Sequence, residues 1–243
     1  GVGPALLALV ACLIVYPLKH PGIRPFLARK AGWKVRSDDA LVTSEAATAS
    51  EIYRWPIAWL MACAFAINTF CYFGVAAWLP RILAEMLQMN SADAGFAASI
   101  YHVIGVIAPL TMMALQRLIR GQTSAILGIV SCAWLLMPLG MLLLPSWWVV
   151  WSACGGLGQG AFFSITFTLV IERTATTAQT RTLSALVQSL GYGLGALGPW
   201  AIGRMVDLTA NWFWPFIVLT VLTGSLVVIS QVVARSTSRP HSR

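Results

Sequence analysis

The sequence predicts an all-α membrane protein in which six membrane-spanning helices form a bundle and one further spanning helix precedes them. Charged residues make up only 10% of the 243-residue chain and apolar residues 58%, and the mean hydropathy is +0.77. A water-soluble domain carries about 25% charged residues, so this composition indicates an integral membrane protein. The apolar residues also fall into seven runs that reach or approach the ~20 residues a helix needs to cross a bilayer.

These seven runs are the predicted spans. We expect them at Val2–Leu18, which is short, and then at Trp55–Leu79, Ala94–Leu115, Thr123–Leu144, Trp147–Ile171, Leu183–Gly203 and Trp212–Ala234. The six spans after the first divide as three plus three, as in transporters built from repeated three-helix units. Sequence similarity between the two triplets is too weak to demonstrate such a repeat.

The segments outside these spans are a linker and a tail. The linker is basic in its first half and acidic and rich in Ala, Ser and Thr in its second, so we expect a tether with one short surface helix. The predicted organisation is a spanning helix (1–18), the linker (19–54), a six-helix bundle (55–234) and a basic tail (235–243). Gly1 stands directly inside an apolar run with no basic stretch ahead of it. We therefore expect a fragment that starts within a longer protein, rather than a signal peptide.

The basic residues predict how the spans are oriented. Of the 16 lysines and arginines, only Arg81 and Arg204 fall in loops on one side, and the other fourteen lie on the side of the linker and the tail. Because lysine and arginine accumulate in cytoplasmic loops, we expect a multi-pass protein of the cell (inner) membrane with a cytoplasmic linker and C-terminus. The net charge of +8 therefore lies in loops, and we expect no nucleic-acid partner.

The stretch from Thr182 to Phe216 is unusually rich in glycine. It begins with ~22 uncharged residues, enough to cross a ~30 Å hydrocarbon layer. The residues that we expect to serve helix packing there are Gly191, Gly195, Gly198 and Pro199. Glycines spaced as GxxxG let membrane helices approach closely. Gln188 and Tyr192 are four residues apart and share one helix face, which favours a helix that lies beside a wet cavity.

Among histidine, aspartate, glutamate, lysine and arginine, only His102 lies near the middle of a predicted span. An ionisable group inside the membrane is a candidate functional residue, and an imidazole with a pKa near ~6.5 can carry a proton or meet a substrate anion. The alternative is a neutral histidine that forms a hydrogen bond between helices. The sequence leaves both interpretations open.

Uncharged polar residues occupy the middle of other spans. Gln159 stands between two glycines, which should leave its amide accessible. Amides, hydroxyls and phenols can bind a small polar solute without the desolvation cost of a full charge, but each can also join two helices. The occurrence of such groups on four different spans favours a substrate cavity, for which the candidates are Asn68, Thr69, Tyr72, His102, Gln159, Gln188 and Tyr192.

The sequence carries no signature of an enzyme. We find no HExxH, no G-x-S-x-G, no pair of carboxylates within a span and no Walker-type loop. The cysteines lie in apolar runs without CxxC or histidine partners, so we expect neither a metal nor another cofactor. A seven-helix receptor or sensor is the main alternative to a transporter, although the long basic linker after the first span does not favour it.

Three stretches of the chain resemble the C-terminal half of the cyanate-transporter-like family, which belongs to the major facilitator superfamily. They are LSALVQSLGYGLGALGPWAIGRMVDLTANWFWPF, GLGQGAFFSITFTL and YFGVAAWLPRIL, and the resemblance covers Trp55 to Ala234. The residues that carry it are chiefly Gln188, Gly191, Tyr192, Gly198, Pro199 and Asp207. The resemblance implies that the first span is the sixth helix of twelve, the linker the central loop and the bundle the C-terminal half of a major facilitator fold.

The resemblance also implies a function and partners. Such proteins move a small solute by alternating access, often coupled to a proton, and the implied substrate is a small anion such as cyanate or a small nitroaromatic compound. The implied partners are the lipid bilayer, that small molecule and an N-terminal half of the same protein. Helices seven and ten would line the central cavity with Asn68, Tyr72 and Gln159, while helices eight and eleven, with His102, Gln188 and Tyr192, would move against the other half.

One position departs from the superfamily pattern. The loop after the third span commonly begins with an acidic residue followed by arginine, but here Gln116 precedes Arg117. The charge pair that usually steadies the inward gate is therefore expected to be weak or absent.

Overall fold

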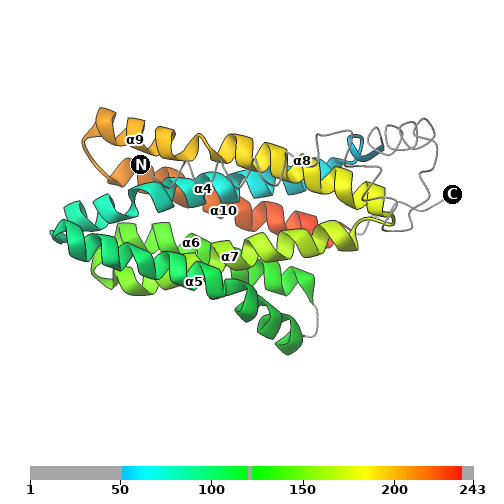
Figure 1. Cartoon of the computed structure of the whole chain (residues 1–243), viewed down its shortest axis with the longest axis horizontal. Helices are drawn as coiled ribbons and strands as arrows, with labels where there is room; N and C mark the ends of the chain where they lie inside the picture. Colours follow the sequence, from blue (N-terminus) through cyan, green and yellow to red (C-terminus); the bar gives the residue numbers. More distant parts are fainter. Residues whose placement is uncertain (1–50, 120–121, 237–243) are drawn as a thin grey trace, which may run out of the picture. The chain divides into compact units, whose positions relative to one another are not determined.

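The computed structural model describes residues 51–119 and 122–236, which form helices joined by short turns (Figure 1). The helices are α4 (Pro56–Leu87), α5 (Ser91–Leu118), α6 (Thr123–Leu143), the short 3-10 helix η1 (Pro145–Trp147), α7 (Trp148–Glu172), α8 (Thr177–Gly195), α9 (Gly198–Thr209) and α10 (Phe213–Arg235). The described residues contain no strand, so the predicted all-α fold is confirmed for them. The predicted span Val2–Leu18 and nearly all of the linker lie outside the described residues.

Five helical segments of the described chain are long and apolar enough to cross a membrane: α4, α5, α6, Pro145–Glu172 and α10. Each lies close to one of the predicted spans. The sixth predicted span, Leu183–Gly203, is two helices in the structure, because α8 ends at Gly195 and α9 starts at Gly198. Pro199 explains the break, since it has no backbone N–H and its ring clashes with the carbonyl group four residues earlier, that of Gly195.

Helix α4 is longer than predicted and extends beyond Leu79 to Leu87. Hydropathy falls at Pro80 and Arg81, where the apolar run ends, but the helix continues for two more turns. An ion pair between Arg81 and Glu85, one turn apart, supports this extension. The helix ends at Leu87, and the next residue, Gln88, adopts the left-handed conformation with φ of 55°.

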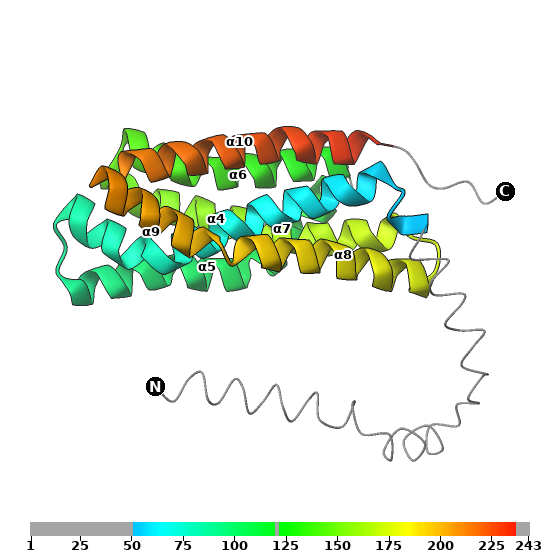
Figure 2. The same cartoon turned by 90° about the horizontal axis from the view of Figure 1, so that it is seen from above.

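The helices stack in three layers, which Figure 2 shows nearly edge-on. Helices α4 and α7 form the middle layer, α5 and α8/α9 lie on one side of it, and α6 and α10 lie on the other. The packing partners repeat: α4 packs on α8 as α5 packs on α7, and α10 packs on α4 as α6 packs on α7. Exchanging α4, α5 and α6 with α7, α8/α9 and α10 leaves this pattern unchanged. The helix packing thus has the repeat of three helices that sequence similarity could not demonstrate.

Glycines bring the helix backbones of both repeated pairs close together. A Cβ on Gly195 of α8 would lie 2.7 Å from the Thr69 hydroxyl of α4. A Cβ on Gly160 of α7 would lie 2.5 Å from the Gly105 carbonyl oxygen of α5, and one on Gly156 would lie 2.7 Å from the Tyr101 carbonyl oxygen. Side chains at these positions would push the helices apart.

Candidate functional site

Five aromatic side chains gather where α4, α7 and α8 meet, and we call them the aromatic wall: Phe65, Phe73, Phe163, Phe167 and Tyr192. Phe65 is fully buried, and its ring centroid lies 5.6 Å from that of Tyr192, 5.7 Å from that of Phe163 and 5.8 Å from that of Phe167. The rings of Phe73 and Tyr192 stack with centroids 6.4 Å apart. Tilted and edge-to-face contacts at these distances are favourable for aromatic rings.

The aromatic wall has open edges. Tyr192 is 40% exposed and Phe163 is 38% exposed, although each contacts the buried ring of Phe65. A planar solute could therefore stack against these rings without first displacing a side chain. Gln188, half-buried and one helical turn before Tyr192, places an amide on the same part of α8. The arrangement can bind a small molecule that is both flat and polar.

A row of stacked rings leads from this wall into the bundle. Tyr72 of α4 contacts Phe73 at 5.3 Å and stacks on Tyr101 of α5 at 6.2 Å, and Tyr101 stacks on Trp134 of α6 at 6.3 Å. Tyr101 and Trp134 are fully buried, and the Tyr101 hydroxyl and the Trp134 indole N–H lack hydrogen-bond partners. Asn68 is also buried with its side-chain oxygen unpaired. Buried polar groups usually find a partner, so these atoms are suited to bind water or a polar solute.

Thr69 has a different environment from Asn68. Its hydroxyl lies 2.7 Å from the carbonyl oxygen of Gly191 on α8 and 2.9 Å from that of Phe65 on its own helix. The side chain is 3% exposed and donates to backbone carbonyls. These contacts favour the interpretation of Thr69 as a residue that joins two helices.

The accessibility of the Gln159 amide differs from the prediction. The glycines on either side were expected to leave its amide accessible, but the side chain is only 9% exposed. Its amide nitrogen lies 2.7 Å from the position that a Cβ on Gly105 would take. Gly158 and Gly160 bring α7 against the backbones of α6 and α5, respectively, so the glycines close the helices around Gln159 instead of opening a path to it.

His102 is exposed on α5 and contacts Tyr101 edge-to-face, with ring centroids 5.3 Å apart. Its exposed neighbours on α5 include Val103, Val106 and Leu110. The imidazole thus lies on the outward face of the layer that α5 and α8/α9 share, not between helices of this bundle.

The glycines predicted to serve helix packing lie between α8/α9 and α4. A Cβ on Gly191 would contact the Phe65 ring, and one on Gly198 would lie 3.1 Å from the Gly74 backbone nitrogen and closer still to the Phe70 carbonyl oxygen. The carbonyl group of Pro199 accepts a hydrogen bond of 2.8 Å from the indole of Trp78. Helix α4 therefore contacts both halves of the broken helix.

Four residues at the far end of α4 form a second polar cluster, the arginine–tryptophan cluster: Trp78, Arg81, Glu85 and Trp212. The Arg81 guanidinium lies 5.4 Å from the Trp78 ring and 6.0 Å from the Trp212 ring. Glu85 accepts from Arg81 at 2.5 Å and from the Trp212 indole at 2.7 Å. The cluster fastens the end of α4 to the turn that leads into α10.

Several residues of the site carry no distinctive signal in the sequence. In the sequence, four of them are ordinary apolar residues of a span: Phe65, Phe73, Phe163 and Phe167. Tyr101 was not selected as a candidate, although its neighbour His102 was. The four-residue spacing of Phe163 and Phe167 was a signal that two rings share one helix face. Nothing in the sequence indicated that these rings meet Tyr192.

Comparison with known proteins gives a family. The Major Facilitator Superfamily matches residues 2–196. The chain is 26% identical over 203 residues to the 2-nitroimidazole transporter of Escherichia coli K12, covering 84% of this chain and 51% of that protein. It is 27% identical over 172 residues to the uncharacterized transporter YycB of Bacillus subtilis 168 (70% and 42%), and 25% identical over 185 residues to the cyanate transport protein CynX of Escherichia coli K12 (71% and 45%).

The chain spans about half the length of these relatives. All three are named as transporters, and none is named as a receptor or an enzyme. The resemblance read from the sequence is thereby confirmed, and the chain is a part of a multi-pass membrane protein. It belongs to the Major Facilitator Superfamily.

Proposed function

We propose that the protein of which this chain is a part is a secondary transporter that moves a small solute by alternating access. The observation that carries the proposal is the aromatic wall, which has two exposed edges and lies near the half-buried Gln188, about midway along α4, α7 and α8. A site at this depth suits a substrate that is held between two halves of a transporter. The missing wall of the cavity would come from the N-terminal half of the same protein.

The substrate class follows from the chemistry of the wall. Stacked rings with free edges favour a flat molecule, and amide and phenol groups favour a polar one. Two relatives are named for small compounds of this kind, 2-nitroimidazole and cyanate. We propose a small planar nitroaromatic compound or a small anion as the substrate. If the substrate is anionic, its countercharge on this chain is His102, since no lysine or arginine lies in the middle of the described spans.

We propose that His102 couples transport to a proton. Its exposure on the layer of α5 and α8/α9 leaves it free to face the other half of the protein, and an imidazole can take up and release a proton. In the full-length protein, His102→Gln should change the dependence of uptake rate on pH. An unchanged pH profile would assign His102 to packing alone.

The orientation and domain organisation predicted from the sequence complete the proposal. The linker (19–54) and the C-terminus would face the cytoplasm, and the protein would lie in the inner membrane. A reporter enzyme fused after the C-terminus, active only in the cytoplasm, tests this topology.

The test of the wall is uptake of radiolabelled 2-nitroimidazole and radiolabelled cyanate into vesicles that contain the full-length protein. We expect Tyr192→Ala and Phe163→Ala to raise the KM for the ring compound about 2- to 10-fold, the range that loss of one aromatic contact implies. Val228→Ala, an exposed position on the outer helix α10, is the matched control and should leave KM unchanged. Equal KM values for all three variants would remove the wall from the substrate site.

A further inference from the structure

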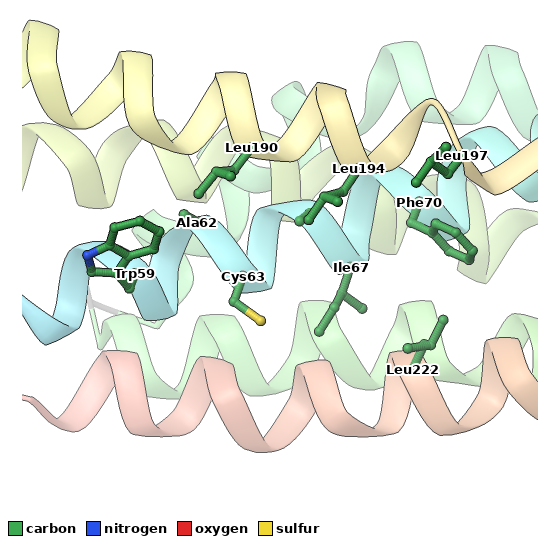
Figure 3. A pocket seen from close by; sticks show the side chains of 10 residues that line it. Trp59, Ala62, Cys63, Ile67, Phe70, Leu190, Leu194, Leu197 and Leu222 are labelled. Atoms are coloured by element: carbon green, nitrogen blue, oxygen red, sulfur yellow. The ribbon is translucent and has the colours of Figure 1, made fainter. Parts of the chain in front are cut away.

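A long apolar groove runs along α4 between α8 and α10 (Figure 3). It has a volume of about 510 Å³, and every one of the ten residues that line it is apolar or a cysteine. In Figure 3, residues of α4 such as Cys63 and Ile67 form its floor, Leu190 and Leu194 of α8 form one side and Leu222 of α10 forms the other. None of these residues belongs to the aromatic wall.

The groove has no occupant within the described part of the chain. Trp59, Leu194 and Leu197 each leave about half of their surface exposed there, at 48%, 50% and 50%. Trp59 belongs to the membrane-spanning helix α4, Leu194 to α8 and Leu197 to the turn between α8 and α9. Because all three are apolar side chains of a membrane protein, hydrocarbon suits the groove better than water does. A groove with three walls holds an acyl chain in a fixed position, unlike a convex helix surface.

The length of the groove fits one leaflet. On α4 it reaches from Trp59 to Phe70, which is eleven residues or about 16 Å along the helix axis. Half of the ~30 Å hydrocarbon core of a bilayer is ~15 Å. One acyl chain that enters at the Trp59 end would therefore extend to the middle of the membrane.

Positive charge surrounds the Trp59 end. Helices α4 and α8 begin at this end and α10 ends there, and the exposed residues Arg54, Arg181 and Arg235 lie at these three helix ends. The indole of Trp59 donates a hydrogen bond of 2.9 Å to the Tyr53 carbonyl, which places the mouth of the groove beside Arg54. Among the described residues at the start of α4 and the end of α10, Arg54 and Arg235 carry two positive charges against the one negative charge of Glu51.

We propose that the groove binds one acyl chain of an acidic phospholipid, whose phosphate lies near Arg54 and Arg235. The apolar lining favours hydrocarbon, and the length of the groove fits one acyl chain from the leaflet at this end. The arginines favour an anionic headgroup. The bound lipid fills the space between α8 and α10, which contact α4 but leave a gap between themselves.

The first experiment is native mass spectrometry of the full-length protein supplied with dioleoyl phosphatidylglycerol or dioleoyl phosphatidylcholine. Wild type should retain phosphatidylglycerol in preference to phosphatidylcholine. Cys63→Trp fills the groove and should reduce retention about tenfold, whereas Val228→Trp adds the same side chain to an exposed face of α10 outside the groove and should not. Full retention by Cys63→Trp, or equal retention of both lipids by wild type, overturns the proposal.

The charged part of the site is tested separately, in variants with little risk to folding because the residues are exposed. Arg54→Gln and Arg235→Gln should each weaken phosphatidylglycerol retention about fivefold, the effect expected for one arginine at an anionic surface. Arg204→Gln, an exposed arginine on α9 away from this end, is the matched control. A loss of the same size in the Arg204 variant would show that the effect is one of net charge and would overturn the assigned headgroup position.

The chain contains the cysteines that test two other occupants. A variant that keeps only Cys12, in the predicted span 2–18, and Cys63, in the groove, is treated with an oxidant in membranes. No disulfide should form if lipid fills the groove. A Cys12–Cys63 disulfide within one molecule would show that the segment 2–18 occupies it, and a Cys63–Cys63 disulfide between molecules would show a second copy, and either result overturns the proposal.

Discussion

The interface between α4 and α8/α9 and the interface between α5 and α7 occupy equivalent places in the repeat, yet they are held together differently. Both use glycines to bring backbones into contact. The first adds side-chain hydrogen bonds across the interface, from Thr69 to Gly191 and from Trp78 to Pro199. For the described residues, no side-chain hydrogen bond that we identify joins α5 to α7.

The difference indicates which helix of the layer formed by α5 and α8/α9 can shift more readily against the middle layer. Helix α9 is fastened to α4 by Trp78, and the end of α4 is fastened to the start of α10 by the arginine–tryptophan cluster. Helix α5 contacts α7 closely through Gly156 and Gly160, without a side-chain hydrogen bond like those of Thr69 and Trp78 among the described residues. We expect α5, with His102, to shift more readily than α9 when the protein changes conformation.

The largest loss of stability is expected from Gly198→Ala, which introduces a methyl group into the interface between α4 and α9. The new methyl group would meet the backbone of Phe70 and Gly74, and a helix backbone cannot move aside as a side chain can. Overpacking of this kind costs about 1–3 kcal/mol and should lower the melting temperature of the full-length protein in detergent.

Gly193→Ala is the matched control for this substitution. It lies on α8, only five residues away, and a Cβ there meets nothing within 4 Å. This variant should melt at or above the wild-type temperature, since alanine is the better helix former by up to about 1 kcal/mol. If both variants lost the same stability, the close approach of α4 and α9 would not be the cause.

Gly160→Ala tests the second interface in the same way, with a smaller expected effect. Its Cβ would crowd the Gly105 carbonyl oxygen at 2.5 Å and the Ala108 methyl group at 2.7 Å. Because no hydrogen bond of the kind formed by Thr69 fixes α5, the helix can shift to relieve part of the overlap, so we expect less than the loss in Gly198→Ala. Gly95→Ala, with nothing within 4 Å, is the control on α5. A loss larger than that of Gly198→Ala would reverse the ranking of the two interfaces.

The sequence predicted the general arrangement because composition and hydropathy act over whole spans. It could not predict features set by single contacts. Hydropathy runs smoothly through Gly198, so the break that Pro199 imposes did not register as the end of a helix. Thr69 and Asn68 are neighbours with similar polarity. Thr69 donates a hydrogen bond to Gly191 on α8, whereas the Asn68 side-chain oxygen has no partner, and this difference depends on where Gly191 lies.

The errors about the site have the same physical origin. Glycines beside Gln159 suggested open space, because a glycine adds no side chain to its own helix. In the membrane the neighbouring helices use that space, and Gly105 and Trp134 approach until it is closed. The aromatic wall was missed for a related reason, since Phe65 and Tyr192 are 127 positions apart and their contact depends on the register of α4 against α8.

The hydrogen bond from Thr69 to Gly191 provides a further test of how the α4–α8 interface differs from the α5–α7 interface. Thr69→Val keeps the shape of the side chain but removes the hydroxyl that bonds to Gly191 on α8. Hydrogen bonds between membrane helices contribute about 0.6 kcal/mol on average, so we expect a small drop in melting temperature. Thr111→Val is the matched control, because the Thr111 hydroxyl bonds to Ala108 within its own helix. Equal effects in the two variants would mean that the bond across the interface adds nothing.

The smallest effect is expected at the arginine–tryptophan cluster, where Arg81→Lys keeps the positive charge. The Arg81 and Glu85 side chains are 49% and 44% exposed, and exposed ion pairs contribute about 0–1 kcal/mol. Lysine can still pair with Glu85, but it lacks the planar guanidinium that lies against the Trp78 and Trp212 rings. Stability should therefore fall less in Arg81→Lys than in Trp78→Phe, which removes the hydrogen bond to Pro199 and keeps a ring. The opposite order would mean that the Arg81–Glu85 ion pair, and not the Trp78 indole, holds α9 against α4. The stability of that contact should then fall as salt concentration rises, because salt screens exposed charges.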